Sequence, residues 1–208
     1  MNLKDLAPKP NQRMIIMGTT GSGKSVLLKK LLQLYNRTIV VDPKGTLGSG
    51  ERGGGHLPGY ELAKTPRELE RLARRHPHVQ YRPDMEHQNA ETWERVFDWI
   101  YRRGAVLLAI DELFDVHEWN RPPKSLRRIL TSGRELGIGF IGCTQRPRGI
   151  DRRIITESEI HAVFHLRDPD DQRFLRARIG EGKLPSYGFW WSKDEEPFDP
   201  PAVKRLKL

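Results

Sequence analysis

Apolar and polar positions follow two different patterns along the chain. The runs at 14–18 (MIIMG) and 105–112 (AVLLAIDE) are almost continuously apolar, as expected for strands that are buried on both faces. Between such runs, apolar residues recur every three or four positions, as in the segment 90–101, which is typical of amphipathic helices. Buried strands separated by amphipathic helices predict an α/β fold with a mostly parallel central sheet flanked by helices on both faces.

Local signals place further elements in this pattern. The segment 65–68 (TPRE) is a capping box with proline at the first helical position, and Asn89 is expected to cap the next helix. Further strands are expected at 38–43, 78–83, 139–144, 162–166 and 187–191, and further helices at 25–35, around 126–130 and after 168.

The chain has 208 residues, a length that fits a single ordinary domain. We expect an N-terminal extension at 1–12, the main domain at 13–192 and a basic, solvated C-terminal tail at 193–208. Residues 45–59 are rich in glycine and show no apolar periodicity. This stretch predicts a loop, which either crosses the surface without a role or contacts a ligand.

The stretch 18–25 (GTTGSGKS) fits the phosphate-binding pattern G-x-x-x-x-G-K-[ST] at every fixed position. It follows an apolar strand and precedes an amphipathic helix, so backbone N–H groups at the helix start would surround phosphate oxygens. Lys24 would reach the β- and γ-phosphates, and Ser25 would ligate Mg²⁺. The expected nucleotide contacts are Gly18, Thr19, Thr20, Gly21, Ser22, Gly23, Lys24, Ser25 and Val26. The sequence thus predicts a nucleoside triphosphate site.

Two acids end the apolar run at 105–112. Asp111 is expected to support the metal, and Glu112 to orient and deprotonate a water molecule. This pair favours hydrolysis over phosphate transfer to a small acceptor. The simpler alternative is that the two acids cap the segment that follows them.

The strand at 139–144 runs into Gln145, Arg146 and Pro147, which are unusual residue types for a simple chain reversal. Ligands bind beyond the carboxyl ends of parallel strands, so Gln145 is expected to sense the γ-phosphate or the attacking water. Arg134 precedes the same strand at its opposite end. It would either complete a neighbouring subunit's site in trans or remain solvated.

The net charge of +9 indicates either a polyanionic partner or a solvated basic surface. No run approaches the length of a membrane span, the start lacks a secretory signal, and a lone cysteine, Cys143, suits a reducing compartment. A soluble protein is therefore expected. His161 and His165 could share a strand face, but no cysteine nearby supports a metal site.

The order of the phosphate-binding loop, the Asp-Glu strand end and GRELGIGFIGCTQRP (133–147) resembles the FtsK/HerA superfamily of ring-forming DNA translocases. Within it, the chain length and the stretch 123–158 look most like the genome-packaging ATPases of tailless icosahedral viruses with internal membranes. The resemblance spans roughly 13–192 and implies a P-loop NTPase with a RecA/FtsK-like core.

The resemblance implies an ATP-driven motor that threads double-stranded DNA through a homo-oligomeric ring, usually a hexamer, and packages a viral genome into a preformed capsid. Its partners would include portal or membrane-vertex proteins of the capsid, in the virion or the host cytoplasm. It also implies ATP and Mg²⁺ as ligands. By the same resemblance, Lys24, Ser25, Asp111, Glu112 and Gln145 take the roles given above. The trans arginine would be Arg134, with Arg146 as the second candidate.

A translocase has to grip the phosphate backbone of any sequence, which suits arginines and lysines on exposed segments. The candidates for DNA contact are Arg146, Arg148, Arg152, Arg153, Lys124, Arg127 and Arg128.

Three other functions stay open at this point. A filamentous-phage assembly or conjugation-type ATPase would generally carry membrane segments. A nucleotide-gated DNA-binding scaffold usually has a second lysine where Thr19 stands. A nucleoside or nucleotide kinase would need an acceptor pocket.

Overall fold

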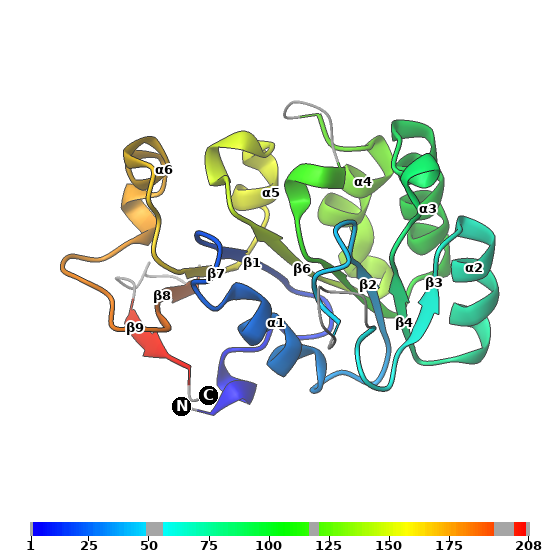
Figure 1. The fold of residues 1–208 in the computed structure, drawn as a ribbon, viewed down its shortest axis with the longest axis horizontal. Helices are drawn as coiled ribbons and strands as arrows, with labels where there is room; N and C mark the ends of the chain where they lie inside the picture. The colour runs from blue at the N-terminus through cyan, green and yellow to red at the C-terminus, as the bar shows by residue number, and fades with distance from the viewer. Residues whose placement is uncertain (1, 49–55, 117–120, 194–201, 207–208) are drawn as a thin grey trace.

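A computed structural model describes residues 2–48, 56–116, 121–193 and 202–206 (Figure 1). The strands are β1 (Arg13–Met17), β2 (Thr38–Val41), β3 (Glu61–Ala63), β4 (His78–Tyr81), β5 (Val106–Ile110), β6 (Ile138–Thr144), β7 (Ile160–Val163), β8 (Gly188–Lys193) and β9 (Ala202–Arg205). They form one nine-stranded sheet in the order β3-β4-β2-β5-β6-β1-β7-β8-β9. β1 to β7 pair in parallel, whereas β8 is antiparallel to both of its neighbours. The predicted, mostly parallel sheet is confirmed.

Helices cover both faces of the sheet, as the sequence predicts. They are α1 (Lys24–Leu32), α2 (Pro66–Arg75), α3 (Ala90–Arg103), α4 (Lys124–Ser132), α5 (Arg152–Thr156) and α6 (Pro169–Phe174). Short 3-10 turns lie at η1 (Leu3–Asp5), η3 (Met85–His87), η4 (Leu113–Val116), η5 (Gly133–Leu136), η6 (Pro147–Gly149) and η7 (Arg176–Arg178).

Alternate strand residues supply two separate apolar cores, one on each face of the sheet. In β1, for example, Ile15 and Met17 join the core under α2, α3, α4 and α5, while Met14 and Ile16 join the core under α1. Successive side chains of a strand point to opposite faces, so a strand covered on both sides reads as continuously apolar. This explains why the buried strands were visible in the sequence.

The two helix caps expected from the sequence are both present. The Thr65 hydroxyl accepts from the Glu68 N–H at 3.2 Å, and the Glu68 carboxylate accepts from the Thr65 N–H at 3.2 Å. The Asn89 side chain accepts from the Thr92 N–H at 2.9 Å. These bonds satisfy N–H groups that the first turn of a helix leaves without a partner.

The end of the chain differs from the expected solvated tail. Residues 202–205 form β9, and the N–H of Leu206 donates to the Tyr187 carbonyl at 3.2 Å. The Leu206 side chain is only 4% exposed and belongs to the core under α1. Burial of the Leu206 side chain stabilises this arrangement, and such a contact between distant segments cannot be read from the local sequence pattern. Residues 194–201 and 207–208 lie outside the described part.

The glycine-rich stretch 45–59 is described only at its two ends, and its middle, 49–55, lies outside the described residues. Leu47 and Leu57 are buried in the core under α1, so both ends of the stretch pack against the domain. Among the described helices, none combines the length and the apolar character that crossing a membrane requires.

Candidate nucleotide site

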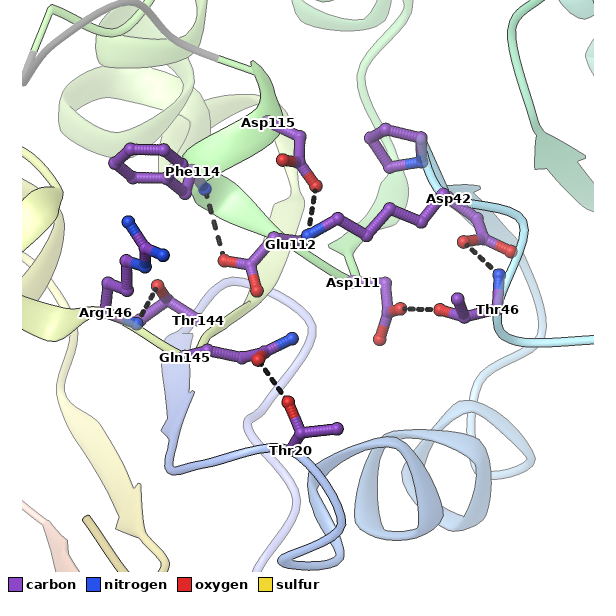
Figure 2. A network of polar contacts seen from close by, with 12 residues as sticks. Thr20, Asp42, Thr46, Asp111, Glu112, Phe114, Asp115, Thr144, Gln145 and Arg146 are labelled. Carbon is purple, nitrogen blue, oxygen red and sulfur yellow. Dashed lines mark hydrogen bonds and ion pairs between the residues drawn. The ribbon is translucent and has the colours of Figure 1, made fainter. Parts of the chain in front are cut away.

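Three neighbouring strands bring the predicted site residues to one edge of the sheet. β6 lies between β1 and β5, with Met17 paired to Thr144 and Ile110 paired to Gly142. The phosphate-binding loop, Gln145 and the acidic pair therefore leave the sheet at the same, carboxyl edge. Figure 2 shows the side chains of Thr20, Gln145, Glu112 and Asp111 close together there. This is where parallel α/β sheets bind ligands.

The phosphate-binding loop has a backbone that only glycine adopts without strain. Gly18, Gly21 and Gly23 have φ values of +152°, +77° and +112°. At Gly18 a Cβ would lie 2.6 Å from the Phe164 Cβ, whereas at Gly21 it would meet nothing within 4 Å. The loop is thus packed tightly against the domain at Gly18, whereas the space next to Gly21 is empty.

The loop also fits a triphosphate chemically. The buried Ser22 hydroxyl has no hydrogen-bond partner among the described residues, and backbone N–H groups at the start of α1 are available to an anion. Lys24 is 7% exposed, and its ammonium group donates to the Thr19 carbonyl at 2.9 Å. Burial lowers the pKa of Lys24, while the carboxylates of Glu112 and Asp111 act in the opposite direction.

Asp111 is held by hydroxyl groups from two different segments. The Ser25 hydroxyl donates to its Oδ1 at 3.3 Å, and the Thr46 hydroxyl donates to its Oδ2 at 2.8 Å. The Asp111 residue is 8% exposed, and burial raises the pKa of its carboxyl group. Hydroxyl and carboxylate oxygens are the ligands that Mg²⁺ prefers, so this cluster fits the predicted metal.

Glu112 sits next to Asp111 and is only 4% exposed. Its Oε1 accepts from the N–H of Phe114 at 3.3 Å, which fixes the carboxylate. Burial raises the pKa of Glu112, and a hydrogen bond with the Thr144 side chain acts in the opposite direction. A fixed, desolvated carboxylate with a raised pKa is suited to accept a proton.

Gln145 directly follows β6, the strand that lies between β1 and β5, and its side chain contacts the phosphate-binding loop. Its Oε1 accepts from the Thr20 hydroxyl at 2.5 Å. The preceding Thr144 hydroxyl accepts from the N–H of Arg146 at 3.1 Å and so shapes the exit from β6. Gln145 thus lies at the carboxyl edge of the sheet beside the phosphate-binding loop, as its place after β6 predicts; a contact with the nucleotide and a sensor role stay predictions.

The two candidate trans arginines lie at opposite edges of the sheet. Arg134, in η5, forms an ion pair with Glu159 away from the nucleotide edge, as its place before β6 predicts. Arg146 lies at the nucleotide edge, where its guanidinium group stacks over the Phe114 ring at 5.4 Å. A role in trans stays a prediction for both.

The residues expected to contact DNA form two groups on the same face of the sheet. Arg148, Arg152 and Arg153 lie in η6 and α5, and the second group, Lys124, Arg127 and Arg128, lies in α4. α4 and α5 cover one common core. Arg148 is ion-paired with Asp170, and Arg128 stacks over the Tyr101 ring at 4.1 Å. Arg127 is half-buried and the other five are exposed, as is the seventh candidate, Arg146, which directly precedes η6.

No residue of the segment that follows β2 was among the predicted site residues, although a ligand contact was left open for the stretch 45–59. Thr46 contacts Asp111, and Lys44 forms a 3.0 Å ion pair with Asp115, three residues after Glu112. A signal was available: Asp42, Pro43 and Lys44 directly follow a buried parallel strand, so they also had to lie at the carboxyl edge of the sheet.

His161 is fully buried in β7, and His165 is exposed beyond the end of that strand. The Nε2 of His161 lies 2.9 Å from the Ile155 carbonyl oxygen, so the neutral ring donates from Nε2. Burial lowers the pKa of His161 to about 4. Within the described residues, no group of three or more His, Cys, Asp or Glu side chains is arranged to hold a metal.

We expect His161 to make folding stability fall in mild acid. An unfolded histidine takes up a proton near pH 6.5, whereas the folded one does so only near pH 4, so the unfolded state binds more protons between these values. The free energy of unfolding should drop by about 2 kcal/mol from pH 7 to pH 5 through this group. Urea denaturation at both pH values measures it. His161→Gln should remove most of this difference, whereas the exposed His56→Gln should keep it; equal pH dependence in all three proteins would contradict the assignment.

Similar proteins are found both by sequence and by structure, although no model of a known protein family matches the chain. The chain is 29% identical over 177 residues to the DNA packaging ATPase P9 of Enterobacteria phage PRD1, which covers 83% of this chain and 72% of that protein. A 48-residue segment is 33% identical to the DNA double-strand break repair helicase HerA of Sulfurisphaera tokodaii, covering 23% of this chain and 10% of the helicase.

Among solved structures, the genome packaging NTPase B204 of Sulfolobus turreted icosahedral virus 2, in complex with AMPPCP, superposes with a TM-score of 0.76. The match covers 96% of this chain and 100% of that one, at 18% identity. At that identity the likeness concerns the fold. Fold, motif order and the two relatives agree: the chain resembles FtsK/HerA-type P-loop ATPases, in sequence the DNA packaging ATPase P9 of PRD1 and in fold the packaging NTPase B204.

Proposed function

We propose that the protein hydrolyses ATP to move double-stranded DNA and that it packages a viral genome into a preformed capsid. One observation carries the proposal: the phosphate-binding loop, Gln145 and the acidic pair leave adjacent strands at one edge of the sheet, in a chain similar over most of its length to the packaging ATPase P9. The fold shared with B204, described with the ATP analogue AMPPCP, supports a nucleotide at this edge.

In this proposal each residue of the site has a separate task. Lys24 and the N–H groups at the start of α1 bind the β- and γ-phosphates of ATP. Ser25 and Asp111 hold Mg²⁺, which when bound neutralises charge on the phosphates. Glu112 takes a proton from the attacking water, and Gln145 orients that water or the γ-phosphate.

The basic residues on α4, η6 and α5 would grip the DNA backbone, and a homo-oligomeric ring, usually a hexamer in such motors, would surround it. Backbone contacts without base contacts allow any sequence to pass. Arg134 lies far from its own nucleotide edge, so an assembly in which it reaches a neighbour's site would complete that site. The rate of ATP turnover per protein molecule should then rise with protein concentration, because more of the protein is assembled into rings.

The DNA part of the proposal is tested by measuring ATP turnover with and without duplex DNA over a salt series. We expect duplex DNA to stimulate turnover, and its affinity to fall steeply with salt because each phosphate contact releases counterions. The double variant Arg152→Ala/Arg153→Ala should reduce the slope of log affinity against log salt by about two.

A matched pair of variants removes the same charge elsewhere. Arg71→Ala/Arg75→Ala changes two exposed arginines of α2 and should leave both the slope and the stimulation near those of the unchanged protein. Equal effects of the two double variants would show that DNA affinity depends on the net charge of the protein and not on a binding site at α5. ATP turnover that ignores DNA altogether would refute the motor, and transfer of phosphate to a small acceptor would identify a kinase.

A further inference from the structure

The short segment that follows β2 forms a tightly anchored turn, residues 42–46, at the nucleotide edge. The Asp42 side chain is fully buried, and its carboxylate accepts from the N–H groups of Thr46 at 3.0 Å and Leu47 at 3.1 Å. It also accepts from the side-chain amide of Gln80 at 2.8 Å. A carboxylate that accepts several hydrogen bonds in a buried place fixes the backbone around it.

Glycine is required at the centre of this turn. Gly45 has a φ of +67°, and a Cβ there would lie 2.7 Å from the Cδ of Arg82. The N–H of Gly45 donates to the Asp42 carbonyl at 3.1 Å and closes the turn. The conformation of the 42–46 turn is therefore fixed by hydrogen bonds within the protein and by a glycine at the one position with positive φ.

From this anchored position the turn contacts two acidic residues that follow β5, namely Asp111 at the end of the strand and Asp115 in η4. The Thr46 hydroxyl donates to Oδ2 of Asp111 at 2.8 Å, and Lys44 pairs with Asp115 at 3.0 Å. Figure 2 shows Thr46 on the side of Asp111 that faces away from the phosphate-binding loop. Since the Ser25 hydroxyl contacts Oδ1, the two oxygens of Asp111 are held by donors from two different segments.

We propose that the 42–46 turn is part of the catalytic centre and that Thr46 is a positioning residue that fixes Asp111 in the orientation in which it supports Mg²⁺. The proposal rests on the proposed ATPase function. With the Thr46 hydroxyl in place, the carboxylate cannot rotate away from the Ser25 hydroxyl without losing a hydrogen bond. Groups that orient metal-supporting side chains typically contribute about tenfold or more to metal affinity.

The test compares Thr46→Val with Thr46→Ser. Valine has nearly the same shape but no hydroxyl, while serine keeps the hydroxyl. Because Thr46 is exposed, neither change should disturb folding. Binding of AMPPCP is measured by calorimetry without metal and at a series of Mg²⁺ concentrations, alongside ATP turnover.

We expect Thr46→Val to raise the Mg²⁺ concentration needed for half-maximal AMPPCP binding by about tenfold and to leave metal-free binding unchanged. Thr46→Ser should behave like the unchanged protein. The matched control, Thr131→Val, removes an exposed hydroxyl that, in the described part of the chain, bonds to backbone carbonyls of α4 and to its neighbour Ser132, and it should have no effect.

The outcomes separate this proposal from the proposed function. A Mg²⁺ dependence of Thr46→Val equal to that of the unchanged protein would overturn the positioning role and leave the ATPase intact. The same would follow if serine failed to restore the dependence, because shape rather than the hydroxyl would then matter. An unchanged protein that neither binds AMPPCP nor hydrolyses ATP would instead refute the function itself.

Discussion

Glu112→Gln is expected to bind ATP nearly as well as the unchanged protein and to turn it over about 10² to 10⁴ times more slowly. The amide has the shape of the carboxylate but cannot accept the proton of the attacking water. The N–H of Phe114 can still donate to the side-chain oxygen, so the loop around residue 112 should keep its structure. Release of phosphate and binding of ATP are measured separately on the same preparation.

The control for this variant is Glu135→Gln, which makes the same chemical change at an exposed position in η5. Its turnover should equal that of the unchanged protein. If Glu112→Gln kept turnover within a few-fold, Glu112 would not be the base. If it lost ATP binding instead, the carboxylate would serve mainly to build the site.

Asp42→Ala is expected to lower the free energy of unfolding by at least about 3 kcal/mol. The change removes the acceptor of three hydrogen bonds at a fully buried position, and each donor left without a partner costs about 1 to 3 kcal/mol. Urea denaturation followed by circular dichroism measures the loss.

Asp98→Ala is the comparison for this change. Asp98 pairs with Arg102 on the outer side of α3, where an ion pair between adjacent turns contributes about 0.5 kcal/mol or less. A similar small loss for Asp42→Ala would mean that water or a neighbouring side chain replaces the carboxylate, and the 42–46 turn would then not be rigidly anchored.

Much of the fold was predictable because the strands are buried on both faces and the long helices carry several turns of apolar spacing. α3, for example, repeats its pattern over 14 residues. The elements that were missed are short: β3 has three residues, β9 has four and α5 has five. Elements of that length contain at most two periods of their repeat, so their structure is decided by neighbours such as β8 rather than by their own sequence.

The candidate site divides in the same way. The phosphate-binding loop is a local pattern with a fixed spacing, and Asp111 and Glu112 mark the end of an unmistakable strand. The bond between Thr46 and Asp111 joins residues 65 positions apart, and no pattern within either segment announces it. A glycine-rich stretch also hides its ordered beginning, because Asp42 anchors it through backbone N–H groups that are present in any sequence.

The chain that leaves β6 links the phosphate-binding loop to the basic residues of α5. Gln145 touches Thr20 of the phosphate-binding loop, and the same unbroken stretch of chain reaches Arg152 seven positions later. Along it, Pro147 is buried and the Arg148 N–H is tied to Asp171 at 3.0 Å, so the stretch has little slack. The residue that contacts the phosphate-binding loop and the basic residues proposed to bind DNA are therefore joined within one subunit by a connection of only seven positions that is also anchored to α6.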